Sequence, residues 1–359
     1  MAFEIGIYSF GELTPDPVTG EVRTPQTRLR EFIEQSEVAD QAGLDVFALG
    51  EHHRADFAVS AVPVVLAAMA TRTKNIKLSS AVTVLSSEDP VRVHQQFSTL
   101  DLISDGRAEI IAGRGSFTES FPLFGYDLDL YSELFAEKLD LLLAIREQNP
   151  ITWSGRLRAP LFDADISPRP LQDKLPLWVA VGGTTASAVR AGTLGLPLAL
   201  AILGGAVNRY APLVQLYRDS ARRAGHDVSA LPVSINSPGF VAPTSKAARE
   251  LSYNYFNRGM LENFHQRGKG FHTPRPAYEA QATLGGGLFV GSPQEIIDKI
   301  LYQHELFGHQ RLLIQLGYGG VPQKDMLKAI ELLGTEVAPV VRREIAAREA
   351  AQSNAKVTR

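Results

Sequence analysis

The sequence predicts an α/β protein that folds as one TIM-type (β/α)₈ barrel, with insertions after the fourth and seventh strands. Short apolar runs of strand length alternate with longer stretches of helical periodicity, a pattern typical of βαβ units with a parallel sheet. We count about eight such units, which is the number in this barrel. The length of 359 residues also fits, since such barrels span ~200 to more than 400 residues as one domain.

Each expected strand is an apolar run that is followed by a loop and then by a helix. The eight expected strands are Glu4–Tyr8, Asp45–Leu49, Ile76–Val84, Arg107–Ala112, Leu177–Val181, Leu198–Ile202, Pro232–Val241 and Arg311–Leu316. Proline is common near the expected helix starts, where it removes no hydrogen bond of the helix. These starts lie near Pro25, Ser60, Pro90, Tyr131, Thr184, Tyr210, Pro293 and Pro322.

Three segments interrupt this alternation. Phe10–Thr24 is rich in Gly, Pro and Asp, so we expect a long loop that acts as a lid on the face where barrel active sites lie. Asn149–Leu175 is expected to form a small hairpin. Pro243–Leu288 is too long for a simple connection, so we expect helices or a functional insertion that shapes the substrate pocket. Residues 1–345 are expected to form a single domain, and 346–359 a polar C-terminal tail.

The composition excludes several kinds of function. The net charge is −3 and the basic residues are scattered, so the chain lacks the basic surface of a nucleic-acid or membrane binder, and a small-molecule substrate is favoured. The absence of cysteine removes disulfides, thiolate nucleophiles, Fe–S clusters and cysteine-bound zinc. No signal peptide and no apolar run of the ~20 residues that span a membrane is recognisable, so we expect a cytoplasmic location.

The first candidate site follows the expected strand Asp45–Leu49 and contains Glu51, His52 and His53. Polar side chains at the carboxyl end of a barrel strand point into the shared mouth, and histidine can move protons near neutral pH. These residues are therefore candidates for acid–base catalysis. A helix-capping or ion-pairing cluster explains the triplet equally well. A metal site is less favoured, because no matching His or Asp group follows the other strands.

The second candidate site is Gly113-Arg114-Gly115, which follows the fourth expected strand. Glycine lets the backbone approach a ligand closely, and the arginine between the two glycines can bind a phosphate through two N–H groups. The pattern therefore suits a phosphorylated cofactor. A tight turn with a surface arginine is the alternative interpretation.

The third candidate site is Gly182–Ser187, which joins the fifth expected strand to a helix. Backbone N–H groups at Gly182 and Gly183, the hydroxyls of Thr184 and Ser187, and the positive end of the helix dipole converge there. Phosphate is the natural occupant of such a site. A helix that begins with an ordinary threonine cap explains the same residues.

Two further segments could surround a cofactor. Gly317–Pro322, with Gly319 and Gly320, follows the last strand, and barrels often bind phosphate near that position. A plain glycine turn is the alternative. The third strand contributes the small and apolar residues Ser80–Val84, which would leave room for a flat ring, although small residues also pack ordinary barrels.

In order and spacing, these segments together resemble the bacterial luciferase-like family of flavin-dependent oxidoreductases. The resemblance extends from about Ile5 to about Pro339 and is strongest in the first half of the chain. The matching segments are Glu51-His52-His53, Ala67–Asn75, Ser80–Arg92, Leu100–Arg107, Gly113-Arg114-Gly115, Leu123-Phe124-Gly125 and Gly195-Leu196-Pro197.

The resemblance implies a TIM barrel that binds FMN and forms a homodimer. His52 takes the place of the histidine that supports flavin chemistry, and Arg114 matches the arginine that binds the phosphate. Gly182–Ser187 covers the second phosphate loop of the family. The bond between Ala81 and Val82 corresponds to a non-prolyl cis peptide bond behind the flavin ring.

Departures from luciferase indicate a non-luminescent member of this family. Gly113 replaces a cysteine, and Ser120 stands where luciferase has an aspartate. The second phosphate loop also lacks luciferase's acidic residue. Long-chain aldehyde oxidation and light emission are therefore not expected.

We expect a two-component monooxygenase, in which a separate flavin reductase supplies reduced FMN and O₂ is used to oxygenate a small organic substrate. His52 and Glu51 are the expected catalytic residues. Hydride transfer with the deazaflavin F420 is one alternative. A non-catalytic flavin-binding subunit is the alternative from another class, and a metal-dependent hydrolase is the residual option.

Overall fold

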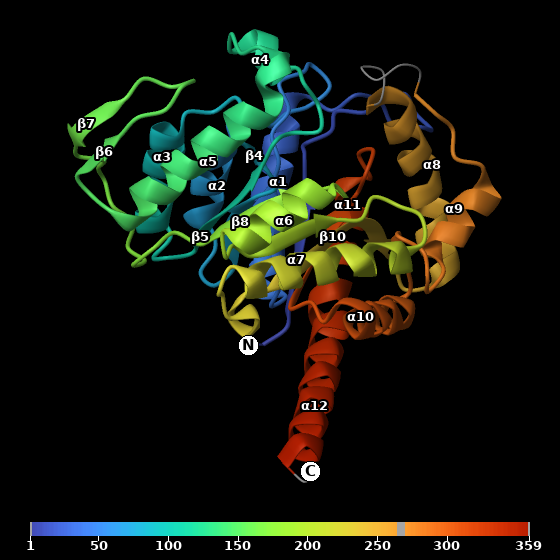
Figure 1. The fold of residues 1–359 in the computed structure, drawn as a ribbon. Coiled ribbons are helices and arrows are strands. Elements are labelled where there is room, and N and C mark those ends of the chain that lie inside the picture. Colours follow the sequence, from blue (N-terminus) through green and yellow to red (C-terminus); the bar gives the residue numbers. More distant parts are fainter. Residues whose placement is uncertain (1, 264–269, 358–359) are drawn as a thin grey trace.

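Eight parallel strands close into a barrel in the computed structural model, which describes residues 2–263 and 270–357 (Figure 1). The pairing between β9 and β10 closes the ring. In order around the barrel, the strands are β1 (Glu4–Ser9), β2 (Val46–Leu49), β3 (Lys77–Ser80), β5 (Ala108–Gly113), β8 (Leu177–Val181), β9 (Leu198–Ala201), β10 (Val233–Val241) and β12 (Arg311–Leu316). All eight expected strands are confirmed, as is the TIM-barrel fold.

The structure differs from the expected strands in two details. The third expected strand, Ile76–Val84, divides into β3 and β4 (Thr83–Val84), on either side of a cis peptide bond between Ala81 and Val82. A short strand, β11 (Phe289–Gly291), pairs with the end of β10. Three residues are too few for alternation to reveal a strand, so the sequence did not indicate β11.

The helices of the barrel begin at or within two residues of the expected positions. At α3 and α10 the start follows from local chemistry: Asp89 accepts a hydrogen bond of 2.9 Å from the backbone N–H of Val91, and Ser292 forms a capping box with Glu295. The helices are α1 (Pro25–Gln41), α2 (Val62–Ala70), α3 (Pro90–Ile103), α5 (Tyr131–Glu147), α6 (Thr185–Thr193), α7 (Ala211–Arg223), α10 (Pro293–Phe307) and α11 (Gln323–Leu332).

The insertions extend the barrel at its periphery (Figure 1). The segment after α5 forms the expected hairpin, from β6 (Ile151–Trp153) and β7 (Leu161–Ala164). The segment after β10 is helical and contains α8 (Ser245–Asn263) and α9 (Arg275–Ala282), while residues 264–269 of this expected insertion lie outside the described residues. Residues 346–357 of the expected tail belong to α12 (Ala338–Val357), which leads away from the barrel at the end opposite α4 (Ser120–Leu123).

The loop after β1 is held over the carboxyl ends of the strands by contacts with two other segments. The hydroxyl of Tyr255 on α8 donates a hydrogen bond of 2.6 Å to Asp16. The guanidinium of Arg23 donates to the carbonyl oxygens of Gly320 and Val321, at 2.6 and 3.1 Å. This loop therefore joins the inserted helix to the loop after the last strand.

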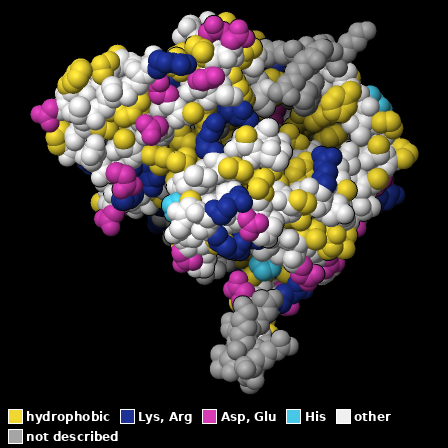
Figure 2. Space-filling model, viewed as in Figure 1, with side chains coloured by type: hydrophobic (Ala, Val, Ile, Leu, Met, Phe, Trp, Pro, Cys, Tyr) yellow, Lys and Arg dark blue, Asp and Glu magenta, His cyan; other side chains and the backbone are white. Residues whose placement is uncertain are grey.

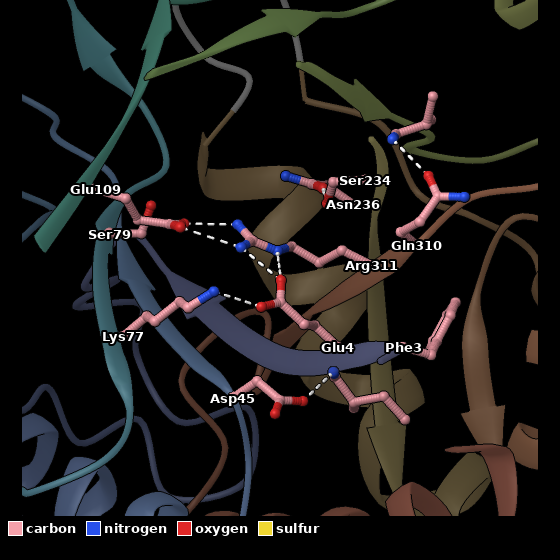
Figure 3. Close-up of polar contacts among 12 residues, drawn as sticks. Phe3, Glu4, Asp45, Lys77, Ser79, Glu109, Ser234, Asn236, Gln310 and Arg311 are labelled. Atoms are coloured by element: carbon pink, nitrogen blue, oxygen red, sulfur yellow. Dashed lines mark hydrogen bonds and ion pairs between the residues drawn. The ribbon is translucent and has the colours of Figure 1, made fainter. Parts of the chain in front are cut away.

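An ion cluster fills the amino-terminal end of the barrel (Figure 3). The guanidinium of Arg311 donates two hydrogen bonds to Glu109, at 2.6 and 3.0 Å, and one of 2.6 Å to Glu4. Lys77 pairs with Glu4, and the Arg311 guanidinium lies 4.2 Å from the centre of the Trp178 ring. Only 2% of the Arg311 surface is exposed. Although burial alone would lower the pKa of Arg311, Glu109 and Glu4 outweigh it and raise that pKa, so Arg311 stays charged.

We predict that Glu109→Ala destabilises the protein by ~3–5 kcal/mol, because it leaves the charge of Arg311 buried beside only one carboxylate. Lys328→Ala removes an exposed ion pair with Glu331 and is the matched control, for which the change is less than ~1 kcal/mol. Urea unfolding measures both free energies. Similar effects of the two substitutions would contradict a structural role for the cluster.

Candidate functional site

The candidate residues gather at the carboxyl ends of neighbouring strands. His52 follows β2, the Ala81–Val82 bond lies between β3 and β4, Arg114 follows β5, and Gly182–Ser187 follows β8. Because the strands are parallel, these segments share one end of the barrel, the end near α4 in Figure 1. This end is the mouth, where barrel active sites lie.

Arg114 and the Gly182–Ser187 loop form one polar cluster. The Nη2 atom of Arg114 donates hydrogen bonds to the hydroxyls of Thr184 and Ser187, at 3.1 and 3.2 Å. The guanidinium also lies 5.1 Å from the centre of the Tyr131 ring, which limits its orientations. The structure thus brings together the second and third candidate sites.

The surroundings of this cluster suit an anion. Gly182 and Gly183 border open space, since a β-carbon built on either residue would meet no atom within 4 Å, and Gly183 has a φ of +106°. Thr184 precedes α6, but its hydroxyl accepts from Arg114 and does not cap the helix. Burial and the nearby charge of Arg114 lower the pKa of Arg190, so a second cation lies close. Figure 2 shows Lys and Arg side chains beside a hollow in this part of the surface.

His52 is enclosed by aromatic rings and held by one carboxylate. Its Nδ1 atom lies 2.9 Å from Oε1 of Glu119, and the two side chains are only 9% and 10% exposed. Burial alone would raise the pKa of Glu119, but hydrogen bonds from His52 and from the backbone N–H of His53 outweigh it, so that pKa is lowered. The ring centres nearest to the imidazole are those of Phe57, Phe117 and Phe10, at 4.2, 4.6 and 5.1 Å.

Glu51 has different neighbours from His52. Its Oε1 atom accepts a hydrogen bond of 2.7 Å from the backbone N–H of Val84, two residues after the cis bond between Ala81 and Val82. Burial raises its pKa to about 8, with smaller contributions from Glu88 and Glu119. Glu51 also lines a cavity of about 260 Å³ together with Thr83. Its geometry is that of a residue that positions the backbone, and its catalytic role stays a prediction.

The glycine loop after β12 contacts other loops of the mouth. Gly319 has a φ of +81° and packs closely against the backbone of Tyr255, while the carbonyl of Gly320 accepts from Arg23. These contacts account for the glycine at position 319 without a ligand. Cofactor binding by Gly319 and Gly320 therefore stays a prediction.

Glu119 and Arg190 belong to the site but were not identified from the sequence. Glu119 lies 67 positions from His52 in the chain, and Arg190 lies on α6, one turn beyond Ser187. An acidic residue in the loop after the Arg114 strand was the available signal for Glu119, because loops at that end of a barrel face the mouth. The neighbouring Ser120, which stands where luciferase has an aspartate, has a hydroxyl that accepts a hydrogen bond of 2.9 Å from Ser87.

Within residues 2–263 and 270–357, no group of three or more His, Asp or Glu side chains is placed so that it could hold a metal ion. None of the helices in these ranges combines the length and apolar character that a membrane span requires.

Comparison with known proteins places the chain among flavin enzymes. The family model for luciferase-like monooxygenases matches residues 3–310. The protein y4vJ of Sinorhizobium fredii is 28% identical over 333 residues, which are 90% of this chain and 94% of that protein. The oxygenase component of the flavin-dependent trigonelline monooxygenase of Acinetobacter baylyi is 24% identical, over 78% of this chain and 81% of that protein.

Solved structures share the same fold. The oxygenating constituent of 3,6-diketocamphane monooxygenase from Pseudomonas putida, in complex with FMN, gives a TM-score of 0.75 at 20% identity and covers 94% of this chain and 99% of its own. The coenzyme F420-dependent tetrahydromethanopterin reductase from Methanopyrus kandleri gives 0.72 at 18% identity, covering 95% and 100%. At these identities the likeness concerns the fold alone.

We predict that Arg114→Ala weakens FMN binding by roughly 10- to 150-fold, which corresponds to the ~1.5–3 kcal/mol of hydrogen bonds to a charged group. Binding of riboflavin, which has no phosphate, changes little. Fluorescence titration with both flavins measures the two affinities. Arg222→Ala, which removes an exposed cation on α7, is the control and leaves both unchanged. An equal loss of affinity for the two flavins would argue against phosphate binding by Arg114.

A second prediction concerns the buried proton of Glu51. The pKa of Glu51 is about 8 in the folded protein against an ordinary value of 4.5, so the folded state binds this proton more tightly than the unfolded chain does. The contribution of this proton to the free energy of unfolding is fully present below about pH 4.5. It is lost as the pH rises through about 8. We therefore expect the wild type to lose stability relative to Glu51→Gln between about pH 5 and about pH 8.

Urea unfolding across this pH range measures the difference. Glu305→Gln changes an exposed glutamate on α10 and serves as the control, for which the difference from the wild type does not depend on pH in this way. A constant difference between the wild type and Glu51→Gln would contradict the raised pKa.

Proposed function

The chain belongs to the luciferase-like monooxygenase family, and from this premise we propose that it is the oxygenase of a two-component FMN-dependent system. It receives reduced FMN from a separate reductase and uses O₂ to oxygenate a small organic substrate. The observation that carries this proposal is the meeting of Arg114 with Thr184 and Ser187 at the mouth of the barrel. The relatives support it, because they include monooxygenases and an oxygenase component.

The residues present fit a flavin mononucleotide. Arg114, Thr184 and Ser187 would hold the phosphate, and the open space at Gly182 and Gly183 would let it approach the start of α6. The ring would lie toward the Ala81–Val82 bond. When bound, reduced flavin supplies the electrons and activates O₂.

The proposed contribution of His52 is a proton transfer at its Nε2 atom, since Nδ1 is occupied by Glu119. The three phenylalanine rings around the imidazole exclude water from this part of the mouth. The proposed role of Glu51 is indirect, because it holds the backbone of Val84 near the Ala81–Val82 bond. An apolar wall next to a proton-transferring group suits a neutral organic substrate.

Hydride transfer with F420 is the second candidate. It is favoured by the similarity of the fold to that of an F420-dependent reductase, and a phosphate cluster at Arg114 would serve either cofactor. F420 has a longer acidic tail, which would need further basic residues at the rim. A non-catalytic flavin-binding subunit would use the phosphate cluster but would not need the pair of His52 and Glu119.

We also propose that the protein forms a homodimer through its α2 and α3 face. Val64 on α2 is 67% exposed, and Leu102 and Ile103 at the end of α3 are 45% and 47% exposed. Large apolar side chains on adjacent helices favour burial against a second copy. The molar mass in solution, measured by light scattering, tests this point.

The proposed function predicts that reduced FMN binds the purified protein more tightly than F420 does. With a flavin reductase, NADH and ¹⁸O₂, a substrate from a panel of ketones, sulfides and aromatic compounds gains one ¹⁸O atom, as measured by mass spectrometry. Turnover with reduced F420 in the absence of O₂ would instead support hydride transfer. Tight FMN binding without any substrate-dependent O₂ consumption would favour the non-catalytic subunit.

A further inference from the structure

The side chain of His52 has one polar contact with the side chains that the structure describes. Its ring is surrounded by Phe10, Phe57 and Phe117, and among the described residues Glu119 is the side chain that hydrogen-bonds it. Neutral imidazole carries one proton, on either ring nitrogen, and a carboxylate beside Nδ1 selects the form with the proton there. The lone pair then resides on Nε2.

Glu119 is itself fixed by the residues that follow it. The hydroxyl of Ser120 is bonded to Ser87, and the fully buried ring of Phe121 stacks on Tyr131 with the ring centres 5.5 Å apart. The same Tyr131 ring lies beneath the guanidinium of Arg114. The positions of Glu119 and Arg114 therefore both depend on contacts that involve the ring of Tyr131.

The other side of Glu119 borders an open groove. This groove has a volume of about 510 Å³ and is lined by Glu119, Phe121, Tyr126, Asp127 and Leu128 among others. The Oε2 atom of Glu119 is buried and has no hydrogen-bond partner in the described protein. A small carboxylate could thus reach the position of the Glu119 side chain from solvent if that side chain were removed.

We propose that Glu119 is the positioning residue for His52: it holds the proton on Nδ1, directs the Nε2 lone pair to the reacting atoms, and stabilises the imidazolium that forms. When Nε2 takes a proton, the positive ring faces the carboxylate of Glu119, and the proton later returns from Nε2 to the product or to water. No net charge accumulates in the pair over a cycle. This assignment rests on the proposed function for the identity of the reaction, but not for the state of the ring.

The first test therefore needs no cofactor. In the ligand-free protein, ¹⁵N chemical shifts of the His52 ring show the proton on Nδ1 in the wild type and a mixture of both forms in Glu119→Gln and Glu119→Ala. An unchanged ring in both folded variants overturns the proposal. Asp127→Asn removes another carboxylate from the same groove and is the matched control, for which the ring stays as in the wild type.

The second test uses turnover. Glu119→Gln lowers kcat by roughly 10²-fold with little change in KM, because proton transfer and not binding is lost. Formate restores part of the activity of Glu119→Ala, since it can enter through the groove, and restores none to His52→Ala. Turnover of Glu119→Ala within twofold of the wild type overturns the proposal. If no flavin-dependent turnover is found at all, the proposed function fails, while the ring state still decides the role of Glu119.

Discussion

The buried ion pair between Arg311 and Glu109 determines the geometry on which the rest of the barrel depends. Arg311 begins β12 and Glu109 belongs to β5, and four steps around the ring of strands separate them, so the pair crosses the full width of the interior. Glu4 on β1 binds the same guanidinium from the neighbouring strand. Burying these charges is costly unless every partner is in place, so strand pairings that separate them are strongly disfavoured. The cluster thus favours one diameter and one register.

The register of the strands in turn brings together the polar cluster of Arg114, Thr184 and Ser187. Ala112 on β5 lies beside Val179 on β8, so the loops that follow the two strands leave the barrel side by side. Arg114 comes two residues after Ala112, and Thr184 comes five residues after Val179, close enough for their side chains to bond. A slip of one residue in a strand would turn its side chains to the opposite face and separate the pair. An interaction at one end of the barrel therefore supports a site at the other.

The sequence predicted the strands and helices, which have a regular pattern of apolar and polar residues. It missed features that depend on contacts between residues far apart in the chain. All eight strands and most helix starts follow from apolar patterning and from proline near the first turn, as at Pro90 and Pro293. The strand β11 is too short to have a pattern. Glu119 was missed because its importance comes from His52, which follows a different strand; an acidic residue in a loop at the mouth was the local signal, and it does not by itself indicate that contact. Glu51 was grouped with His52 because they are adjacent in the chain, but consecutive residues after a strand can turn toward different neighbours, and Glu51 bonds to Val84 instead.

The two ends of the candidate site differ in charge and polarity, and this difference would orient the proposed cofactor. Arg114 and Arg190 make one end cationic, with hydroxyls and a helix start beside them, while three phenylalanine rings enclose His52 at the other. A molecule with a phosphate and a flat apolar ring can satisfy both ends in only one direction, because an unpaired phosphate among aromatic rings would be strongly disfavoured. Tyr131 contributes to both ends, since it lies beneath Arg114 and stacks on Phe121 beside Glu119. The proposed phosphate contact of Arg114 and the proposed positioning of His52 therefore involve the same short segment of chain between Arg114 and Tyr131, and a change in that segment would affect both.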